Sequence, residues 1–255
     1  MHYWLMVAAG MALLPKPTVV MIHGAGGGGW EYDSWRPVFE NAGWTVVAPD
    51  LMPSEKGLAE TTFDDYVTQV VEVCRKHERV VLVGASMGGI IALKAAEKVR
   101  PIAVVLVNGS APKGLSGRDE PAQEVPDIIR WAGGPIEDSR TAMPDSDEAT
   151  IQKAWKRWRD ESGKVIRAIR EGVEARRPGC SVLVVIGRED DTIPPETSRR
   201  VAEAMAADVH EYAGMSHVGP LLGKRAAEVA GAVVAWLDAR LGPNAPAPNQ
   251  PNYSR

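Results

Sequence analysis

The sequence carries a serine at a position typical of a catalytic nucleophile. Ser86 lies in "VGASMGG", where residues 84–88 read G-x-S-x-G between an apolar run and a helical pattern. A sharp turn between a strand and a helix holds such a serine in a strained backbone conformation and projects its hydroxyl outward. A glycine-rich turn with an incidental serine is the alternative. Because a serine hydroxyl is a poor nucleophile until a base takes its proton, a histidine must lie nearby.

Of the five histidines, His217 has the position that suits a base. It lies in "YAGMSHVGPLL", directly after the last predicted strand, at the sheet edge where the serine must also emerge. His2 is terminal, His77 ends a helical pattern, His210 lies inside a strand, and His23 belongs to a glycine-rich loop. We therefore predict that His217 takes the proton of the serine.

A carboxylate is also required, because it fixes the tautomer of the base and stabilises its cation. The stretch "VLVVIGREDDTIPPET" places Glu189, Asp190 and Asp191 at the end of one predicted strand. Position alone leaves all three open. An aspartate that is not the triad acid is predicted to cap the following helix.

The glycine-rich loop in "VVMIHGAGGGGWEYDSW" admits two interpretations. Residues 24–29 satisfy G-x-G-x-x-G after a strand, and Asp50 follows at the distance typical of a dinucleotide site. A dinucleotide loop should run straight into a helix whose N-terminus faces the pyrophosphate. Here the stretch 30–32 intervenes, and the helix is predicted to start at Asp33 or Ser34. This favours an oxyanion-binding loop over a dinucleotide-binding reductase.

The elements that must position these residues alternate along the chain. Six runs are apolar and rich in β-branched residues, and near-continuous apolarity is typical of strands covered on both faces of a parallel sheet. Helical patterns lie between them. The fold class is therefore α/β, a doubly wound, mostly parallel sheet with right-handed crossovers. The predicted strands are 18–22, 45–48, 79–84, 102–107, 181–187 and 209–212.

One interval is too long for an ordinary crossover. Residues 111–178 are predicted to form an insertion, with a helix from about 147 to 175, and to cover the ligand-binding edge of the sheet as a lid. One or more of Trp131, Trp155 and Trp158 should form the roof or a wall of the substrate pocket, because so much apolar surface must pack on something. A surface elaboration without contact to the site is the alternative.

Ser86, Asp190 and His217 follow one another along the chain in the order of nucleophile, acid and base that is typical of the α/β-hydrolase superfamily. The chain resembles that superfamily over residues 18–241. The acid turn of that family commonly reads glycine, two residues, aspartate, three residues, proline, which here selects Asp190. Asp191 with Pro195 has the same internal spacing. The chain lacks the first strands usual in the family. "HGAGGGGW" is also loosely similar to the small methylesterase and hydroxynitrile lyase branch.

The resemblance implies a function and an oxyanion hole. In the family, the backbone N–H groups at the positions of Ala25 and Met87 hold the oxyanion, and glycine at Gly26 would let the loop approach the substrate. We expect a serine hydrolase that cleaves a small to medium carboxylic ester through an acyl-enzyme, without cofactor or metal. Thioesterase, lactonase, C–C hydrolase, lyase or perhydrolase chemistry on the same triad remain alternatives, as does a non-enzymatic ligand receptor.

Length and composition are typical of one globular α/β domain, and the charge favours a small molecule as its ligand. The chain has 255 residues, a net charge of -4 and a pI near 5.8, which give no reason to expect nucleic acid or an anionic membrane as partner. Cys74 and Cys180 make no metal spacing and are predicted to be reduced packing residues. We expect a monomer or homodimer.

The two ends are predicted to carry no chemistry. Residues 1–17 are apolar but have no basic start or clear cleavage site, and are too short to span a bilayer, so a cytoplasmic location is expected and secretion is the alternative. Residues 242–255 are rich in proline and asparagine and are predicted to be a disordered tail.

Overall fold

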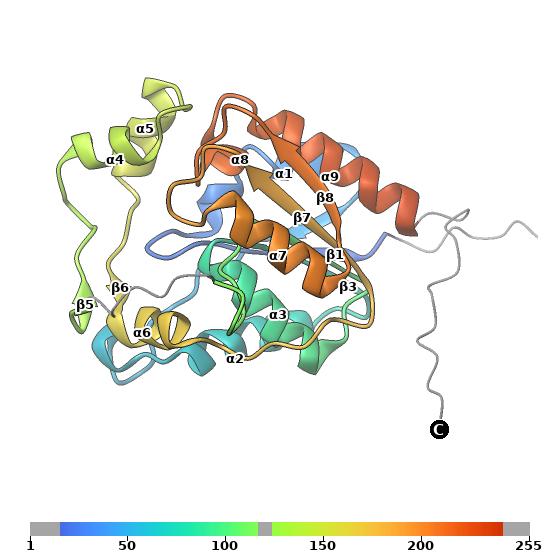
Figure 1. The fold of residues 1–255 in the computed structure, drawn as a ribbon, viewed down its shortest axis with the longest axis horizontal. Coiled ribbons are helices and arrows are strands. Elements are labelled where there is room, and N and C mark those ends of the chain that lie inside the picture. Colours follow the sequence, from blue (N-terminus) through green and yellow to red (C-terminus); the bar gives the residue numbers. More distant parts are fainter. Residues whose placement is uncertain (1–15, 117–123, 242–255) are drawn as a thin grey trace, which may run out of the picture.

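Six parallel strands form the central sheet of the computed structural model, which describes residues 16–116 and 124–241 (Figure 1). Their order is β2-β1-β3-β4-β7-β8, and every neighbouring pair is parallel. The predicted doubly wound parallel sheet is confirmed. The strands are β1 (Thr18–Ile22), β2 (Thr45–Val47), β3 (Val80–Ala85), β4 (Ala103–Val107), β7 (Ser181–Gly187) and β8 (Asp208–Tyr212).

The strands are apolar on both faces because helices cover both faces. In β1, Val19 and Met21 belong to one hydrophobic core, and Val20 and Ile22 belong to the other. All four side chains are fully buried, which explains why the strand reads as a continuous apolar run.

Helices of both faces alternate with the strands (Figure 1). The first core contains residues of α1 (Arg36–Asn41), α8 (Gly219–Leu222) and α9 (Ala226–Leu241), and the second contains residues of α2 (Phe63–Cys74), α3 (Met87–Val99) and α7 (Pro195–Met205). Helix α2 begins with a capping box: Thr62 accepts the amide of Asp65, and the Asp65 carboxylate accepts the amide of Thr62.

The helix after the glycine-rich loop begins later than predicted. A single 3₁₀ turn, η1 (Gly29–Tyr32), follows the loop, and α1 starts at Arg36 without a side-chain cap. Asp33 instead pairs with Lys153 and Arg157 of the insertion, at 2.8 and 2.9 Å. These ion pairs give the aspartate a tertiary partner, so it does not cap the helix.

The insertion between β4 and β7 lies beside the sheet (Figure 1). Its elements are β5 (Ile128–Ile129), α4 (Ile136–Ala142), α5 (Glu148–Trp155), β6 (Glu161–Ser162) and α6 (Gly163–Glu171), and a further 3₁₀ turn, η2 (Leu58–Glu60), contacts β6 and α6. The predicted single helix from 147 to 175 is wrong. The chain leaves helical geometry after α5 and pairs β6 antiparallel with β5, because tertiary hydrogen bonds override local helix propensity.

The two halves of the insertion pack on opposite faces of the sheet. Met143, Ile151 and Ala154 join the core of α1 and α9, whereas Val165 joins the core of α2 and α3. Residues 156–162, between α5 and α6, therefore cross from one face to the other.

Other features of the chain add little to the site. Cys74 and Cys180 are free thiols. Within residues 16–116 and 124–241, no helix is long and apolar enough to cross a bilayer. Residues 1–15 of the apolar N-terminal segment and the predicted tail at 242–255 lie outside the described residues.

Helix α3 packs directly on the end of β1, and a glycine permits this approach. A Cβ atom at Gly88 would lie 2.2 Å from the carbonyl oxygen of Ile22 and 2.7 Å from that of His23. Both atoms belong to the backbone, so neither can rotate away. The position admits no side chain without movement of α3.

We expect Gly88→Ala to lower the free energy of unfolding by about 1–3 kcal/mol, because the added methyl group overpacks this contact. Gly231→Ala in α9 is the matched control, since no neighbouring atom lies within 4 Å of a Cβ placed there. The control should raise the free energy of unfolding by up to about 1 kcal/mol through helix propensity. Urea denaturation followed by circular dichroism measures both, and equal stability of the two variants would contradict the close packing.

Candidate active site

Ser86 occupies the turn between β3 and α3 in a conformation that non-glycine residues rarely adopt. Its φ is 50° and its ψ is -121°. Its amide donates to the carbonyl of Val107 at 3.0 Å, and its own carbonyl accepts the amides of Gly89 and Ser110, both at 2.9 Å. Such strain persists only where surrounding contacts hold it, and it is typical of active sites.

The structure brings Ser86, His217 and Asp190 into one hydrogen-bonded chain. His217 Nε2 lies 2.8 Å from Ser86 Oγ, and His217 Nδ1 lies 2.8 Å from Asp190 Oδ2. An ionised Asp190 can only accept, so Nδ1 carries the proton and Ser86 Oγ donates to Nε2. Ser86 and His217 are both half-buried, so the chain of hydrogen bonds begins at a surface that a substrate can reach.

The three acidic neighbours after β7 have different contacts. Asp190 is 5% exposed, and its Oδ1 accepts the amides of Thr192 and Ile193 at 2.9 and 2.7 Å. Asp191 is exposed and accepts the Thr192 hydroxyl at 3.2 Å. Glu189 accepts two amides of the loop before His217. Asp190 is therefore the acid that reaches the histidine.

Asp191 does not cap helix α7, so the predicted capping role of the second aspartate is wrong. The N-cap position of α7 is Pro194, and no side chain accepts a hydrogen bond there. The prediction is wrong because Asp191 lies before the N-cap position, which Pro194 occupies, and Pro195 at the first position of the helix has no amide hydrogen to bind.

Asn108 is a site residue that the sequence reasoning missed. It is buried at the end of β4 with a φ of 43°, and its Nδ2 donates to the carbonyl of His217 at 2.8 Å. Its Oδ1 accepts the amide of Gly187, at the end of β7, at 2.8 Å. This side chain connects the loop that carries His217 to the end of β7, which precedes Asp190. Its sequence signal is an asparagine that directly ends a buried strand, since asparagine tolerates the left-handed region.

The predicted oxyanion donors are the amides of Ala25, which follows Gly24, and of Met87, which follows Ser86; a Cβ atom placed at Gly24 would lie 3.3 Å from Ser86 Cβ. Among the described acceptors, none takes a hydrogen bond from the amide of Ala25 or of Met87. Ala25 is half-buried, whereas Met87 is buried at the first position of α3. Both amides thus remain available, as an oxyanion hole requires.

The amides around Ala25 are occupied by carboxylates. Glu31 accepts from Gly24 at 3.0 Å, Glu161 accepts from Gly26 at 3.0 Å, and Asp50 accepts from Gly29 at 2.7 Å. A pyrophosphate would need these amides and the N-terminus of a long helix, but a single 3₁₀ turn follows the loop. The dinucleotide interpretation therefore does not fit the structure.

Two titratable groups lie buried beneath this loop. His23 accepts the Leu51 amide at Nε2 and donates from Nδ1 to the Gly24 carbonyl at 2.7 Å, and burial lowers its pKa to about 4. The ring is therefore neutral, and both of its nitrogens have protein partners, so neither is free to accept a proton from Ser86. Burial also raises the pKa of Glu31 to about 7.

The three tryptophans predicted to line the pocket have different positions. Trp131 is 41% exposed and lies against Gly26, where an added Cβ would come within 2.2 Å of the indole ring. Trp158 packs edge-on against Trp30, with ring centroids 4.9 Å apart. Trp155 donates to the carbonyl of Gly134 at 2.7 Å. Of the three, Trp131 is the one in contact with the glycine-rich loop.

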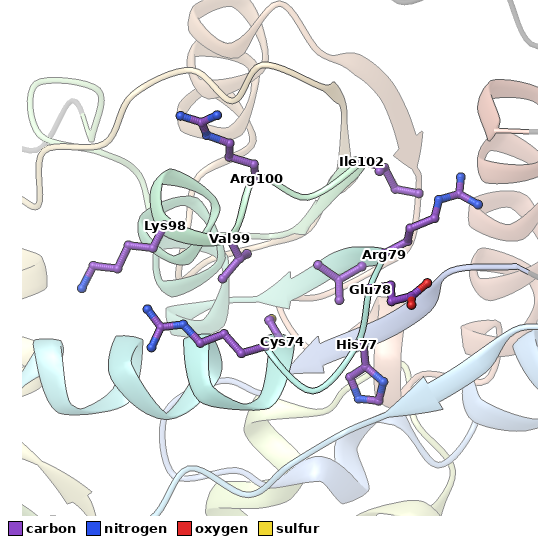
Figure 2. Close-up of a pocket in the computed structure, with 10 residues that line it drawn as sticks. Cys74, His77, Glu78, Arg79, Lys98, Val99, Arg100 and Ile102 are labelled. Carbon is purple, nitrogen blue, oxygen red and sulfur yellow. The ribbon is translucent and has the colours of Figure 1, made fainter.

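A hollow of about 240 Å³ lies at the opposite edge of the sheet (Figure 2). It is lined by residues that end α2 and α3 and precede β3 and β4. Figure 2 shows the side chains of Lys98, Arg100 and Arg79 pointing away from one another. The basic groups do not converge on a common point, so this hollow is not the functional site.

We expect the stability of Glu31→Gln relative to the parent protein to depend on pH. The carboxyl has a higher pKa when folded, about 7 against 4.5, so its contribution is fully present below pH 4.5 and lost as the pH rises to 7. Glutamine cannot ionise. The difference in free energy of unfolding should therefore grow in favour of the variant between these pH values, by on the order of 3 kcal/mol.

Chemical denaturation at several pH values measures this difference. Glu40→Gln on the exposed side of α1 is the control, and its difference from the parent protein should stay nearly constant. A constant difference for Glu31→Gln as well would show that the buried carboxyl is ionised at all these pH values.

Comparison of the fold with solved structures finds the same architecture. Tomato methylketone synthase I superimposes with a TM-score of 0.68 at 18% identity, covering 88% of this chain and 99% of that chain. Polyneuridine aldehyde esterase gives a TM-score of 0.66 at 20% identity over 86% and 99% of the two chains. A pyrethroid hydrolase from Sphingobium faniae gives 0.66 at 20% identity over 88% and 98%.

Comparison of the sequence finds shorter matches and a family. Salicylic acid-binding protein 2 of Nicotiana tabacum is 37% identical over 86 residues, which are 31% of this chain and 33% of that protein. Norfluorocurarine synthase 1 of Strychnos nux-vomica is 39% identical over 77 residues, 28% and 29% of the two chains. The matched segments thus span about a third of these relatives. The model of the alpha/beta hydrolase family matches residues 19–232. Together with the predicted and observed fold, this match places the chain in the alpha/beta hydrolase family.

Proposed function

We propose that the chain is a serine hydrolase that cleaves a small to medium carboxylic ester through an acyl-enzyme. The observation that carries the proposal is the hydrogen-bonded chain from Ser86 through His217 to Asp190, with both distances at 2.8 Å. This is the geometry that activates a serine hydroxyl, and it needs no cofactor.

Acylation proceeds in two steps. As Ser86 Oγ attacks the ester carbonyl, its proton moves to His217 Nε2 and the carbonyl electron pair moves to the oxygen. The carbonyl then re-forms, the bond to the leaving alcohol breaks, and His217 returns the proton to the alkoxide. Asp190 stabilises the imidazolium between these transfers. Water repeats the sequence in the place of the serine and releases the acid.

The developing oxyanion is the charge that the site must stabilise. The amides of Ala25 and Met87 are the available donors, and Met87 N also lies at the N-terminus of the 13-residue helix α3, whose dipole favours negative charge. Loss of one such donor typically costs about 10²–10³ in kcat.

The insertion, residues 111–178, acts as a lid in this proposal. Trp131 is the wall of the substrate pocket nearest the oxyanion loop, because it lies against Gly26. Trp158 and Trp155 have packing and hydrogen-bond partners within the protein and are assigned structural roles.

The names of the similar proteins support hydrolysis without selecting a substrate. One structural neighbour is named an esterase and another a hydrolase, whereas two of the similar proteins are named synthases and one is named for binding salicylic acid. Thioester, lactone and C–C bond cleavage, lyase or perhydrolase chemistry, and simple ligand binding are therefore the other outcomes of the test.

We expect Ser86→Ala to abolish hydrolysis of p-nitrophenyl esters and labelling by a fluorophosphonate probe, because only the nucleophile is phosphonylated. Asp190→Asn should lower kcat by on the order of 10⁴, by analogy with serine proteases, and Asp191→Asn should change it little. A panel of acyl lengths, with thioesters and lactones alongside, measures kcat/KM. Labelling that survives Ser86→Ala would transfer the role to another residue, and a parent protein that binds without turnover would identify a receptor.

We expect Trp131→Ala to change the preferred acyl length or KM with little change in melting temperature, because the ring is partly exposed and lines the pocket. Trp158→Ala is the matched comparison. It should cost up to about 3–5 kcal/mol of stability and keep the acyl-length profile, because its ring packs against Trp30. Steady-state kinetics and thermal melting of both variants distinguish a pocket wall from a structural tryptophan. The reverse pattern would assign the pocket wall to Trp158.

A further inference from the structure

Three consecutive charged residues of the insertion, Arg159, Asp160 and Glu161, point inward. They lie in the segment between α5 and α6 that crosses the carboxyl edge of the sheet. Asp160 accepts the amides of Trp131 and Ala132, both at 3.1 Å, and so fixes the backbone at the exposed Trp131. The other two contact the oxyanion loop itself.

Glu161 is 2% exposed, and no ion pair between described residues includes it. Its Oε2 accepts the amide of Gly26 at 3.0 Å. Its Oε1 accepts the hydroxyl of Tyr66 at 2.8 Å and the amide of Ser162 at 2.7 Å. A carboxylate buried without a cation is costly unless hydrogen bonds satisfy it, and these three donors supply such bonds.

Arg159 binds the two peptide units that follow the Gly26 N–H. Its amide donates to the Gly26 carbonyl at 2.7 Å, and its Nε donates to the Gly27 carbonyl at 2.7 Å. Its Nη2 lies 3.1 Å from Nε2 of His23. The Leu51 amide also donates to this nitrogen, at 2.9 Å. Since guanidinium and amide groups only donate, both contacts keep the His23 proton on Nδ1, which donates to the Gly24 carbonyl.

These contacts fix the two peptide planes that flank Ala25. The Gly24 carbonyl and the Ala25 N–H share one plane, which His23 holds, and Arg159 holds His23. The Ala25 carbonyl and the Gly26 N–H share the next plane, which Glu161 holds. The Ala25 N–H has no acceptor among the described residues. Its direction therefore depends on groups that the insertion supplies.

We propose that Arg159 and Glu161 are positioning residues for the oxyanion hole, so that the insertion completes the catalytic site as well as covering it. This inference rests on the proposed serine hydrolase function. It assigns to the insertion a role in kcat, whereas a lid that only shapes the pocket would act on KM.

Glu161→Gln tests the proposal with little change of shape. The amide oxygen can still accept from Tyr66 and Ser162, but the amide nitrogen then faces the Gly26 N–H, donor against donor. We expect kcat and kcat/KM for a p-nitrophenyl ester to fall together by about 10- to 100-fold, because a misdirected donor weakens the transition state and not the bound substrate. The inhibition constant of a trifluoromethyl ketone, whose serine adduct carries an oxyanion, should rise by the same factor.

Tyr66→Phe is the matched control, because it removes a hydrogen bond from the same carboxylate without touching the loop. It should lower the melting temperature but leave kcat and the inhibition constant unchanged. Arg159→Lys is the second variant. It cannot donate to Gly27 and His23 together, so it should show the Glu161→Gln pattern to a smaller degree, and it carries the test if Glu161→Gln does not fold.

Two results would overturn the proposal: a folded Glu161→Gln with kcat and inhibition constant unchanged, or an equal loss of kcat in Tyr66→Phe. The amide proton shift of Gly26 separates this failure from failure of the proposed function, because it needs no turnover. A parent protein that hydrolyses no ester refutes the function. A Gly26 shift that is the same in Glu161→Gln as in the parent refutes the hydrogen bond on which the inference depends.

Discussion

The backbone of Ser86 lies in a conformation that a free chain would leave, and the rest of the site is arranged around the contacts that hold it there. Its amide and carbonyl are bound by Val107 and Ser110, at the end of the neighbouring strand β4. Asn108, between those two residues, binds the carbonyl of His217 and the amide of Gly187. One short stretch at the end of β4 therefore sets the positions of Ser86, His217 and the strand that precedes Asp190.

The glycine-rich loop is rigid for a different reason. Carboxylates and a neutral histidine lie buried beneath it. The carboxylates accept hydrogen bonds from the loop amides, and the histidine donates one to a loop carbonyl. Buried polar groups are costly when left unpaired, so every amide that a carboxylate binds resists displacement. Between Gly24 and Gly27, the amide of Ala25 differs from its neighbours in that no described acceptor binds it. The loop thus holds this donor between fixed neighbours, as stabilisation of a developing oxyanion demands.

The insertion is part of the same network. Its first half packs with α1 and α9 and its second half packs with α2 and α3, so the segment between them must cross the active-site edge. That crossing explains why residues 158–162 are not helical although the sequence around them favours helix. Helical geometry would turn Arg159 and Glu161 away from Gly26, which both contact.

Features that arise from neighbouring residues were readable in the sequence: the six strands from their apolar runs, the serine turn from small residues at fixed spacing, and His217 from its place after the last strand. Features that depend on distant partners were not. Asp190 and Asp191 are adjacent and share the same spacing to a proline, and only the folded turn directs one of them to His217. Glu161 meets Gly26 across 135 residues, and Asn108 meets His217 across 109. Local periodicity carries no trace of such hydrogen bonds, because they form only after packing has brought the two backbones together.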